Sequence, residues 1–283
     1  MNKNNGYITI MVIWVAAILI VLSSGLVIYV SFQQRALKNY IKTVKASYIA
    51  KTGLNDVMFD FFSELKSKLN EGDITLSEIN NMYQNIPFAD GVYSAIIEDE
   101  KSKANINTAS NLLYRNIMNL LEIDDSDRKA ESILVWRREH GAFATVEELG
   151  LISDLDTNDC FKLIPYWTTY SLGTPGSCSI NVNTASRIIL KAHLDEFKAV
   201  PGTEEKLIKK RPFKSLEAME KYLRKISPNL SENMVGYFTT SEPVHRVYVT
   251  GSLEGKYISK INAVFSLWLR KHELICLHYF WQE

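Results

Sequence analysis

Three residues capable of metal chemistry occur near the end of the sequence, where His272, Cys276 and His278 recur at even-numbered spacing. Side chains alternate between the two faces of a strand, so these three would share one face and could act as soft metal ligands. A closed structural metal site takes a fourth ligand, and none is evident in this otherwise apolar segment. We therefore interpret them as ordinary strand residues, and we predict no metal ion and no other cofactor.

Motifs that mark enzymes are missing from the sequence. There is no Gly-x-Ser-x-Gly nucleophile elbow, no phosphate-binding loop and no His-Glu-x-x-His helix. The cysteines Cys160, Cys178 and Cys276 are too few and too scattered for a disulfide scaffold or a paired-cysteine zinc site. A bridge between Cys160 and Cys178 could form outside the cytosol. We expect a protein that is not an enzyme.

A cluster of basic residues is the best candidate for binding an anion. Residues 179–240 carry eleven Lys and Arg against seven Asp and Glu, whereas residues 104–168 carry six against eleven. The cluster itself comprises Lys206, Lys209, Lys210, Arg211 and Lys214. A charge run is usually only a solvated face, and the whole chain has no net charge. Nucleic acid is therefore disfavoured as a partner.

The same two stretches share a repeated motif. Asn105 to Ser110 reads Asn-Ile-Asn-Thr-Ala-Ser, and Asn181 to Ser186 reads Asn-Val-Asn-Thr-Ala-Ser. An asparagine side chain can accept a hydrogen bond from an unpaired N–H group at the start of a helix. We therefore expect Asn107 and Asn183 to cap helices that begin at the threonine that follows each of them.

Residues 104–240 are predicted to be an all-helical, duplicated unit. Thr145 and Glu148 form the sequence pattern of a capping box, which indicates a further helix. This arrangement resembles the helix-hairpin-helix units of competence DNA receptors, in which a glycine-rich turn lends N–H groups to a phosphate. Here the turn of the first copy, residues 122–126, reads Glu-Ile-Asp-Asp-Ser and would repel phosphate.

All of these elements follow one long hydrophobic segment near the N-terminus. There is no charged residue from Tyr7 to Gln34, and residues 7–30 would form a helix about 36 Å long. That length exceeds the roughly 30 Å hydrocarbon core of a bilayer. A cleaved secretory signal has an apolar stretch of only about 7 to 15 residues. The segment is therefore long enough to cross a membrane.

The charges that flank this span argue for a particular orientation. Lys3 precedes it, whereas four basic residues follow it, namely Arg35, Lys38, Lys42 and Lys45. By the positive-inside rule, this asymmetry favours a cytoplasmic body. On these residues alone, the flanking charges therefore argue against a body on the outer side of the membrane, and the orientation stays open.

Beyond the span, apolar residues at helical spacing predict that the same helix continues to about Asn70. Segments rich in β-branched and aromatic residues predict strands near both ends of the body. They are Val92 to Glu98, Val244 to Thr250, Tyr257 to Leu269 and Glu273 to Trp281. We expect these strands to form one sheet that is interrupted by the helical unit.

Five features occur in a particular order along the chain. They are the polar leader ending at Gly6, the uncharged span, the stretch Ala50-Lys-Thr-Gly-Leu54, the strand before Glu98-Asp-Glu100 and the two Asn-x-Asn-Thr-Ala copies. Together they resemble the minor pseudopilin K family of type II secretion systems. The resemblance covers nearly the whole chain. It implies an α+β fold, in which a long N-terminal helix precedes a pilin-like antiparallel sheet interrupted by the helical insert.

The resemblance also implies a processing step and a location. Prepilin peptidase would cut after Gly6 and leave Tyr7 as the mature, methylated N-terminus. The chain would cross the bacterial inner membrane once, with its body in the periplasm, and this orientation would override the positive-inside objection. The implied partners are other minor pseudopilins of the I and J types and the pseudopilus. The implied function is protein export and pseudopilus initiation as a tip subunit.

Two positions refine this comparison. Most pilins carry Glu at the fifth mature position, whereas Met11 stands there in this chain, as an apolar residue does in K-type subunits. A carboxylate in the bilayer is costly unless the N-terminal amine of a neighbouring subunit neutralises it. A subunit at the end of a filament, with no further subunit above it, therefore needs no such carboxylate. Where K-type subunits carry an Asp-rich calcium-binding stretch, this chain reads Trp136-Arg-Arg-Glu139. We therefore do not predict calcium binding.

These observations predict four parts. They are a leader at 1–6, a transmembrane and rod helix at 7–72, a sheet domain at 73–103 plus 241–283, and the helical insert at 104–240. The alternative function is that of a membrane-anchored helix-hairpin-helix DNA receptor, or of a minor type IV pilin in DNA uptake.

Overall fold

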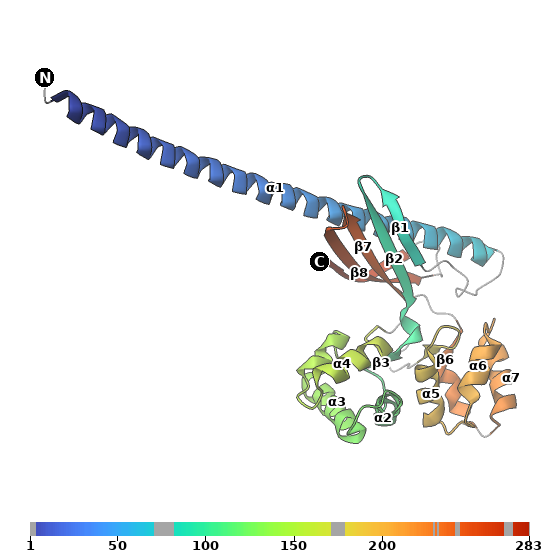
Figure 1. Cartoon of the computed structure of the whole chain (residues 1–283). Coiled ribbons are helices and arrows are strands. Elements are labelled where there is room, and N and C mark those ends of the chain that lie inside the picture. The colour runs from blue at the N-terminus through green and yellow to red at the C-terminus, as the bar shows by residue number, and fades with distance from the viewer. Residues whose placement is uncertain are drawn as a thin grey trace.

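The computed structural model describes residues 4–70, 82–170, 179–228, 230, 232–240, 244–268 and 274–282. Helix α1 spans Asn4–Asn70 without a break. Its first half extends away from the rest of the molecule, and its second half lies along a sheet (Figure 1). The prediction that the membrane segment continues as one helix to about Asn70 is thus confirmed.

The sheet has five strands in the order β1-β2-β7-β8-β9, and neighbouring strands are antiparallel. The strands are β1 (Met82–Phe88), β2 (Gly91–Asp99), β7 (Val244–Leu253), β8 (Tyr257–Trp268) and β9 (Leu274–Gln282). Asp99 at the end of β2 lies opposite His245 of β7. The predicted interrupted sheet is therefore confirmed.

Strand β1 is the strand that the sequence did not predict. It has a register shift between Tyr83 and Ile86, and Asn85 has a positive φ of 50°. It also contains Pro87, which cannot donate a backbone hydrogen bond. An irregular edge strand of this kind lacks the regular alternation by which strands are recognised.

The rod helix α1 packs on the sheet through small residues. Ala46 and Ala50 are fully buried. A Cβ atom on Gly251 of β7 would lie 2.5 Å from the Ala50 backbone nitrogen and 2.6 Å from the Ala46 carbonyl oxygen. A Cβ on Gly53 would lie 2.6 Å from the ring of Tyr93. The helix and sheet therefore approach so closely that only glycine fits at these contacts.

The chain between β2 and β7 forms two helical lobes below the sheet (Figure 1). The first contains β3 (Ala104–Asn105), α2 (Asn111–Leu120), α3 (Ser126–His140), η3 (Val146–Leu151), α4 (Thr157–Leu163), η4 (Ile164–Tyr166) and β4 (Trp167–Thr168). The second contains β5 (Ile180–Asn181), α5 (Arg187–Glu196), α6 (Thr203–Lys210), α7 (Leu216–Ile226), η5 (Glu232–Tyr237) and β6 (Phe238–Thr239).

The two lobes repeat the same plan. In each, the short strand that opens the repeated motif pairs in parallel with the strand that ends the lobe. Val182 donates its N–H to the Thr239 carbonyl at 2.9 Å, just as Ile106 donates to Thr168 at 2.9 Å. The lobes meet where the side chain of Asn116 donates to the carbonyl of Ala192 at 3.0 Å.

Two separate hydrophobic cores occur in the described residues. One is built from α1, β2, β7 and β8, and the other extends through both helical lobes, from Ala104 to Phe238. Each core can exclude water by itself, because its apolar residues contact one another. We propose that the rod with its sheet and the insert at 104–240 are two folding units, as the division of the sequence predicts.

Candidate functional site: the rod helix and the junction at Asp99 and Glu100

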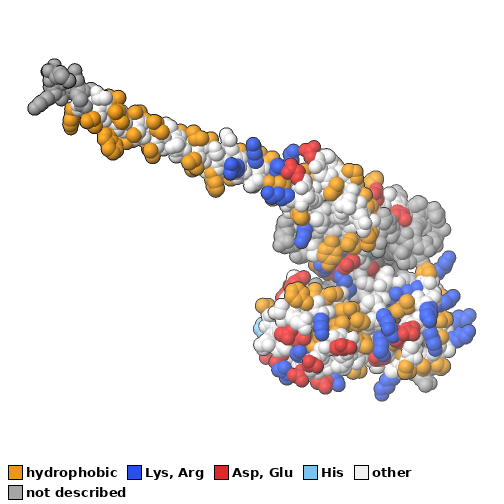
Figure 2. Space-filling view, in the orientation of Figure 1, with side chains coloured by type: hydrophobic (Ala, Val, Ile, Leu, Met, Phe, Trp, Pro, Cys, Tyr) orange, Lys and Arg blue, Asp and Glu red, His pale blue; other side chains and the backbone are white. Residues whose placement is uncertain are grey.

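The N-terminal half of α1 has no partner in the described structure. Within those residues, α1 is long and apolar enough to cross a membrane, with a window of mean hydropathy 2.7 of which no part is buried. Figure 2 shows this apolar surface extending from the body. Gly6 and Tyr7 lie in the first turn, and Met11, one turn later, is 63 % exposed.

Two of the four basic residues after the span bind the sheet. Lys42 contacts Glu254 at 2.6 Å, and Lys45 contacts Asp90 at 3.1 Å. Glu254 and Asp90 lie in turns at the end of the sheet nearest the span. Lys42 and Lys45 therefore have acidic partners on the sheet, in addition to any effect on membrane orientation.

An apolar stripe continues beyond the span on the face of α1 that points away from the sheet. It consists of Leu37, Ile41, Tyr48 and Phe59, which are 59 %, 46 %, 65 % and 73 % exposed. At 3.6 residues per turn they lie within an arc of about 40°. One apolar face of this helix is buried on the sheet. The other can be buried only by packing against another molecule.

A buried carboxylate joins the first lobe to the sheet. The Glu100 side chain is fully buried, 2.6 Å from Arg246 Nε and 3.2 Å from Lys103 Nζ, and it accepts a hydrogen bond from the Thr168 hydroxyl. Burial by itself would raise the pKa of Glu100. The charges of Lys103 and Arg246, with the hydrogen bonds, outweigh burial and lower it below its usual value.

The preceding residue joins the second lobe. One oxygen of Asp99 accepts hydrogen bonds from the Asn181 side chain at 2.7 Å and from the Thr184 hydroxyl at 2.6 Å. Because Asp99 ends β2 and Glu100 follows it, adjacent carboxylates bind one lobe each. We call Asp99 and Glu100 the junction. In the sequence they are only part of an acidic triplet, so their partners could not be inferred.

The prediction that Asn107 and Asn183 cap helices is wrong. The helices begin at Asn111 and Arg187, and their caps are Ser110 and Ser186, whose hydroxyls accept from the N–H three residues later at 3.0 and 3.3 Å. Residues 106–108 and 182–184 of the motifs form a separate turn rather than the first turn of the helix. That turn moves each helix start three residues along the chain.

The motif asparagines instead bind distant backbone. Asn107 accepts from the Phe143 N–H at 2.7 Å and donates to the Phe143 carbonyl at 2.9 Å. Asn183 makes the same pair of bonds to Phe213, at 2.8 and 3.0 Å. Each side-chain amide thus pairs with the N–H and the carbonyl of one residue, as a residue of a neighbouring strand would. It joins the start of its lobe to the segment after the lobe's second helix.

The other features of the insert divide into confirmed and changed ones. Glu148 accepts from the Thr145 N–H at 3.0 Å, so the predicted capping box is confirmed, although it opens a 3₁₀ helix. Arg211 is not available to an anion in the way the basic cluster predicts, because it donates to the Ala185 carbonyl at 2.6 Å. Burial lowers the pKa of Arg211 to about 10. The cluster's lysines stay exposed, and Figure 2 shows Lys and Arg over the second lobe.

The candidate metal and disulfide residues are only partly described. Among the described residues, no group of three or more His, Cys, Asp and Glu could hold a metal ion. His272 and Cys178 lie outside the described residues, and Cys276 and His278 lie in β9, whose side chains are not described. Cys160 is buried, and burial raises the pKa of its thiol.

A solved structure shares this fold. A chain of the GspK-GspI-GspJ complex of the type 2 secretion system from enterotoxigenic Escherichia coli superposes with a TM-score of 0.63 at 13 % identity, covering 89 % of this chain and 99 % of that chain. No family model and no curated protein matches the sequence. The fold is therefore α+β and like that of a chain of this complex, with a long apolar helix, an antiparallel sheet and further helices.

Proposed function

We propose that this protein is a minor pseudopilin: a non-enzymatic subunit at the tip of the periplasmic pseudopilus of a type II secretion system. It would be anchored in the inner membrane by residues 7–34, with its body in the periplasm. The observation that carries the proposal is the rod helix. It is continuous, its N-terminal half is apolar and unburied, and its C-terminal half packs on the sheet. Such a helix can sit in a bilayer or among other helices without refolding.

The apolar stripe supports partners of the same kind. Leu37, Ile41, Tyr48 and Phe59 continue the apolar surface of the span below the membrane, so a neighbouring helix could pack along both. The similar structure is a complex of GspK, GspI and GspJ. We propose that I-type and J-type minor pseudopilins pack on this stripe.

The shape of the body supports the tip position. The two lobes stand away from the rod on the far side of the sheet (Figure 1). The junction ties them to the sheet through buried and partly buried polar contacts, so they cannot swing aside freely. A body of this width would obstruct close packing of helices along a filament, whereas it fits at an end. Met11 agrees with that position, since a terminal subunit needs no carboxylate to pair with the next amine.

Processing at Gly6 is the first test. The mature protein, purified from cells that contain prepilin peptidase, should begin at Tyr7 when its N-terminus is sequenced. Replacing Gly6 with Val should block cleavage, whereas the matched change Gly25→Val in the span should not. A wild-type protein that keeps Met1 in such cells would exclude the pseudopilin function.

Co-purification is the second test. The full chain should be recovered with small pilin-like proteins, and Leu37→Asp or Tyr48→Asp should release them. Phe161→Asp, which changes an exposed phenylalanine on the insert outside any proposed contact, serves as the control. Recovery of a lone monomer at native expression levels would count against the tip role.

The second candidate function is a DNA receptor, favoured by the exposed lysines of the second lobe. Lys206, Lys209, Lys210 and Lys214 are exposed, and within the described residues none of them forms an ion pair. If they bind phosphates, the full chain should retard duplex DNA and lose it steeply as salt rises. Absence of retardation at low salt removes this function.

A further inference from the structure

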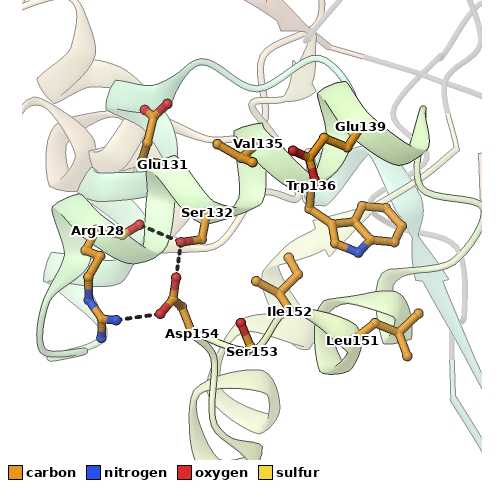
Figure 3. A pocket seen from close by; sticks show the side chains of 10 residues that line it. All are labelled: Arg128, Glu131, Ser132, Val135, Trp136, Glu139, Leu151, Ile152, Ser153 and Asp154. Atoms are coloured by element: carbon orange, nitrogen blue, oxygen red, sulfur yellow. Dashed lines mark hydrogen bonds and ion pairs between the residues drawn. The ribbon is translucent and has the colours of Figure 1, made fainter.

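A groove of about 440 Å³ lies on the first lobe, between α3 and residues 151–154, which comprise the end of η3 and the segment after it. Residues of α3 at helical spacing form one wall, and four consecutive residues form the other (Figure 3). The lining residues are Arg128, Glu131, Ser132, Val135, Trp136 and Glu139 on α3, and 151–154 opposite.

The groove is built rigidly although its floor is apolar. Asp154 accepts from Arg128 and from Ser132, and these bonds join the second wall to α3 (Figure 3). The ring of Trp136 stacks between those of His140 and Phe143, with centroid distances of 4.8 and 4.4 Å. The bonds of Asp154 therefore join the two walls, and the stacking fixes the orientation of the Trp136 ring.

Leu151 is an exposed apolar residue at this groove. It is 70 % exposed, and the half-buried side chains of Val135 and Trp136 line the same groove. Contiguous apolar surface of this kind, rimmed by polar residues, marks interaction sites on soluble domains. The groove thus offers apolar area that the fold itself does not use.

Two carboxylates at the rim indicate the charge of an occupant. Glu131 and Glu139 line the groove eight residues apart on α3, which is about 12 Å along the helix. Among the described residues neither has a cationic partner, and Glu131 only accepts a hydrogen bond from Asn111. The surrounding lobe, residues 104–168, carries five more acidic than basic residues. A phosphate-bearing ligand would be repelled here.

We propose that this groove docks a basic amphipathic helix of a partner protein. Apolar residues of that helix pack on Leu151 and Trp136, and Lys or Arg residues about two turns apart pair with Glu131 and Glu139. Along α3, Trp136 lies between Glu131 and Glu139, two carboxylates without a cationic partner among the described residues. This order matches a partner helix whose apolar residues lie between two cations. The inference does not depend on the proposed function, because it concerns the insert and not the rod helix.

The probe is a fluorescein-labelled peptide of about 15 residues built from Leu, Lys and Ala, with leucines three and four apart and lysines about eight apart. It is titrated by fluorescence anisotropy into the full chain held in phosphatidylcholine nanodiscs. We expect saturable binding. We expect the double variant Glu131→Gln, Glu139→Gln to bind about 3- to 10-fold more weakly. Leu151→Ser should weaken binding about 5-fold.

Controls separate docking from a loss of structure. Phe161→Ser removes an apolar side chain that is 74 % exposed and outside the groove, so it should leave affinity unchanged. All the altered residues are exposed, so the melting temperature should stay the same in each variant. Binding no stronger than to empty nanodiscs, or equal effects of Leu151→Ser and Phe161→Ser, would overturn the proposal. Equal affinity for a peptide with its leucines spread around the helix would do the same.

Discussion

Asn107 and Asn183 show how single side chains hold the insert together. Each forms hydrogen bonds with both the backbone N–H and the backbone carbonyl of one residue, Phe143 or Phe213, which lie 36 and 30 residues further along the chain. Both functions of the amide are used, since its oxygen accepts and its nitrogen donates. A helix cap uses the oxygen alone, so the two roles can be distinguished by chemistry.

Asn107→Asp should separate these roles. Aspartate caps helices as well as asparagine does. In the observed pairing it cannot donate to the Phe143 carbonyl and would place a charge beside that oxygen. We expect the free energy of unfolding, measured with urea on the full chain in mild detergent, to fall by about 1 to 3 kcal/mol. Ser215→Asp, at the observed cap of α7, should be tolerated. Equal tolerance of Asn107→Asp would argue for a cap.

His193 gives the insert a dependence on pH. It is fully buried, neither ring nitrogen has a hydrogen-bond partner in the described structure, and burial lowers its pKa from 6.5 to about 4. The nearest acid is Glu196, 4.0 Å away. The unfolded chain therefore binds this proton more readily than the folded one between pH 6.5 and 4. Stability is complete above pH 6.5 and is lost as the pH falls through that range.

Unfolding at pH 7 and pH 5 tests this effect. The wild type should lose stability between the two, and His193→Leu should lose roughly 2 kcal/mol less, since each pKa unit corresponds to about 1.4 kcal/mol. Burial also lowers the pKa of His245, against the charges of Asp99 and Glu100, so part of the loss should remain in the variant. An unchanged pH dependence would contradict the role of His193.

At the scale of elements, the contact between α1 and the sheet depends on residues with small side chains or none. Ala46 and Ala50 lie along the helix face that meets Gly251, and Gly53 receives the ring of Tyr93. The stretch Ala50-Lys-Thr-Gly-Leu54 therefore supplies two of the small residues that this close approach requires. Larger residues would push the rod helix off the sheet, because the opposing atoms at Gly251 are backbone and cannot turn aside.

Gly251→Ala should therefore be costly. The new methyl would lie 2.5 Å from the Ala50 backbone nitrogen. We expect a loss of about 2 to 3 kcal/mol of stability and faster proteolysis of residues 46–61. The matched control is Gly150→Ala in η3, where nothing lies within 4 Å of the added atom. If both variants melt at the same temperature, the helix and sheet are not packed as described.

At the scale of the whole molecule, one helix carries both the span and a wall of the sheet core. The junction fixes the insert to that sheet, so the orientation of the lobes follows the orientation of the rod. An assembly that packs the rod helix therefore also positions the grooved first lobe and the lysine-bearing second lobe.

Met11→Glu should perturb assembly of such a molecule. The new carboxylate would lie in the apolar span and would need a partner amine from another subunit. Assembly is measured as recovery of pilin-like partners with the full chain, and we expect that recovery to change. Ser24→Ala, at a hydroxyl that bonds only its own helix, is the control. Wild-type recovery with Met11→Glu would remove the argument that the missing acid matters.

The sequence by itself determined the local features of this protein. An uncharged run and helical spacing were enough to predict one helix to about Asn70, and β-branched segments were enough for four of the five strands of the sheet. The repeated motif revealed the duplication, since similar sequences form similar lobes. These predictions succeed because hydrophobic periodicity reflects the geometry of a helix or a strand over a few turns.

Only the tertiary structure decided what the polar residues do. Asn107 pairs with Phe143, Asp99 binds Asn181, and Glu100 meets Arg246, which lies 146 residues away in the chain. An asparagine at a helix start has the same local signature whether it caps or bridges, and an acidic triplet has the same signature whether exposed or buried. The partner of a buried polar group is set by how remote segments pack, and spacing along the chain does not contain that information.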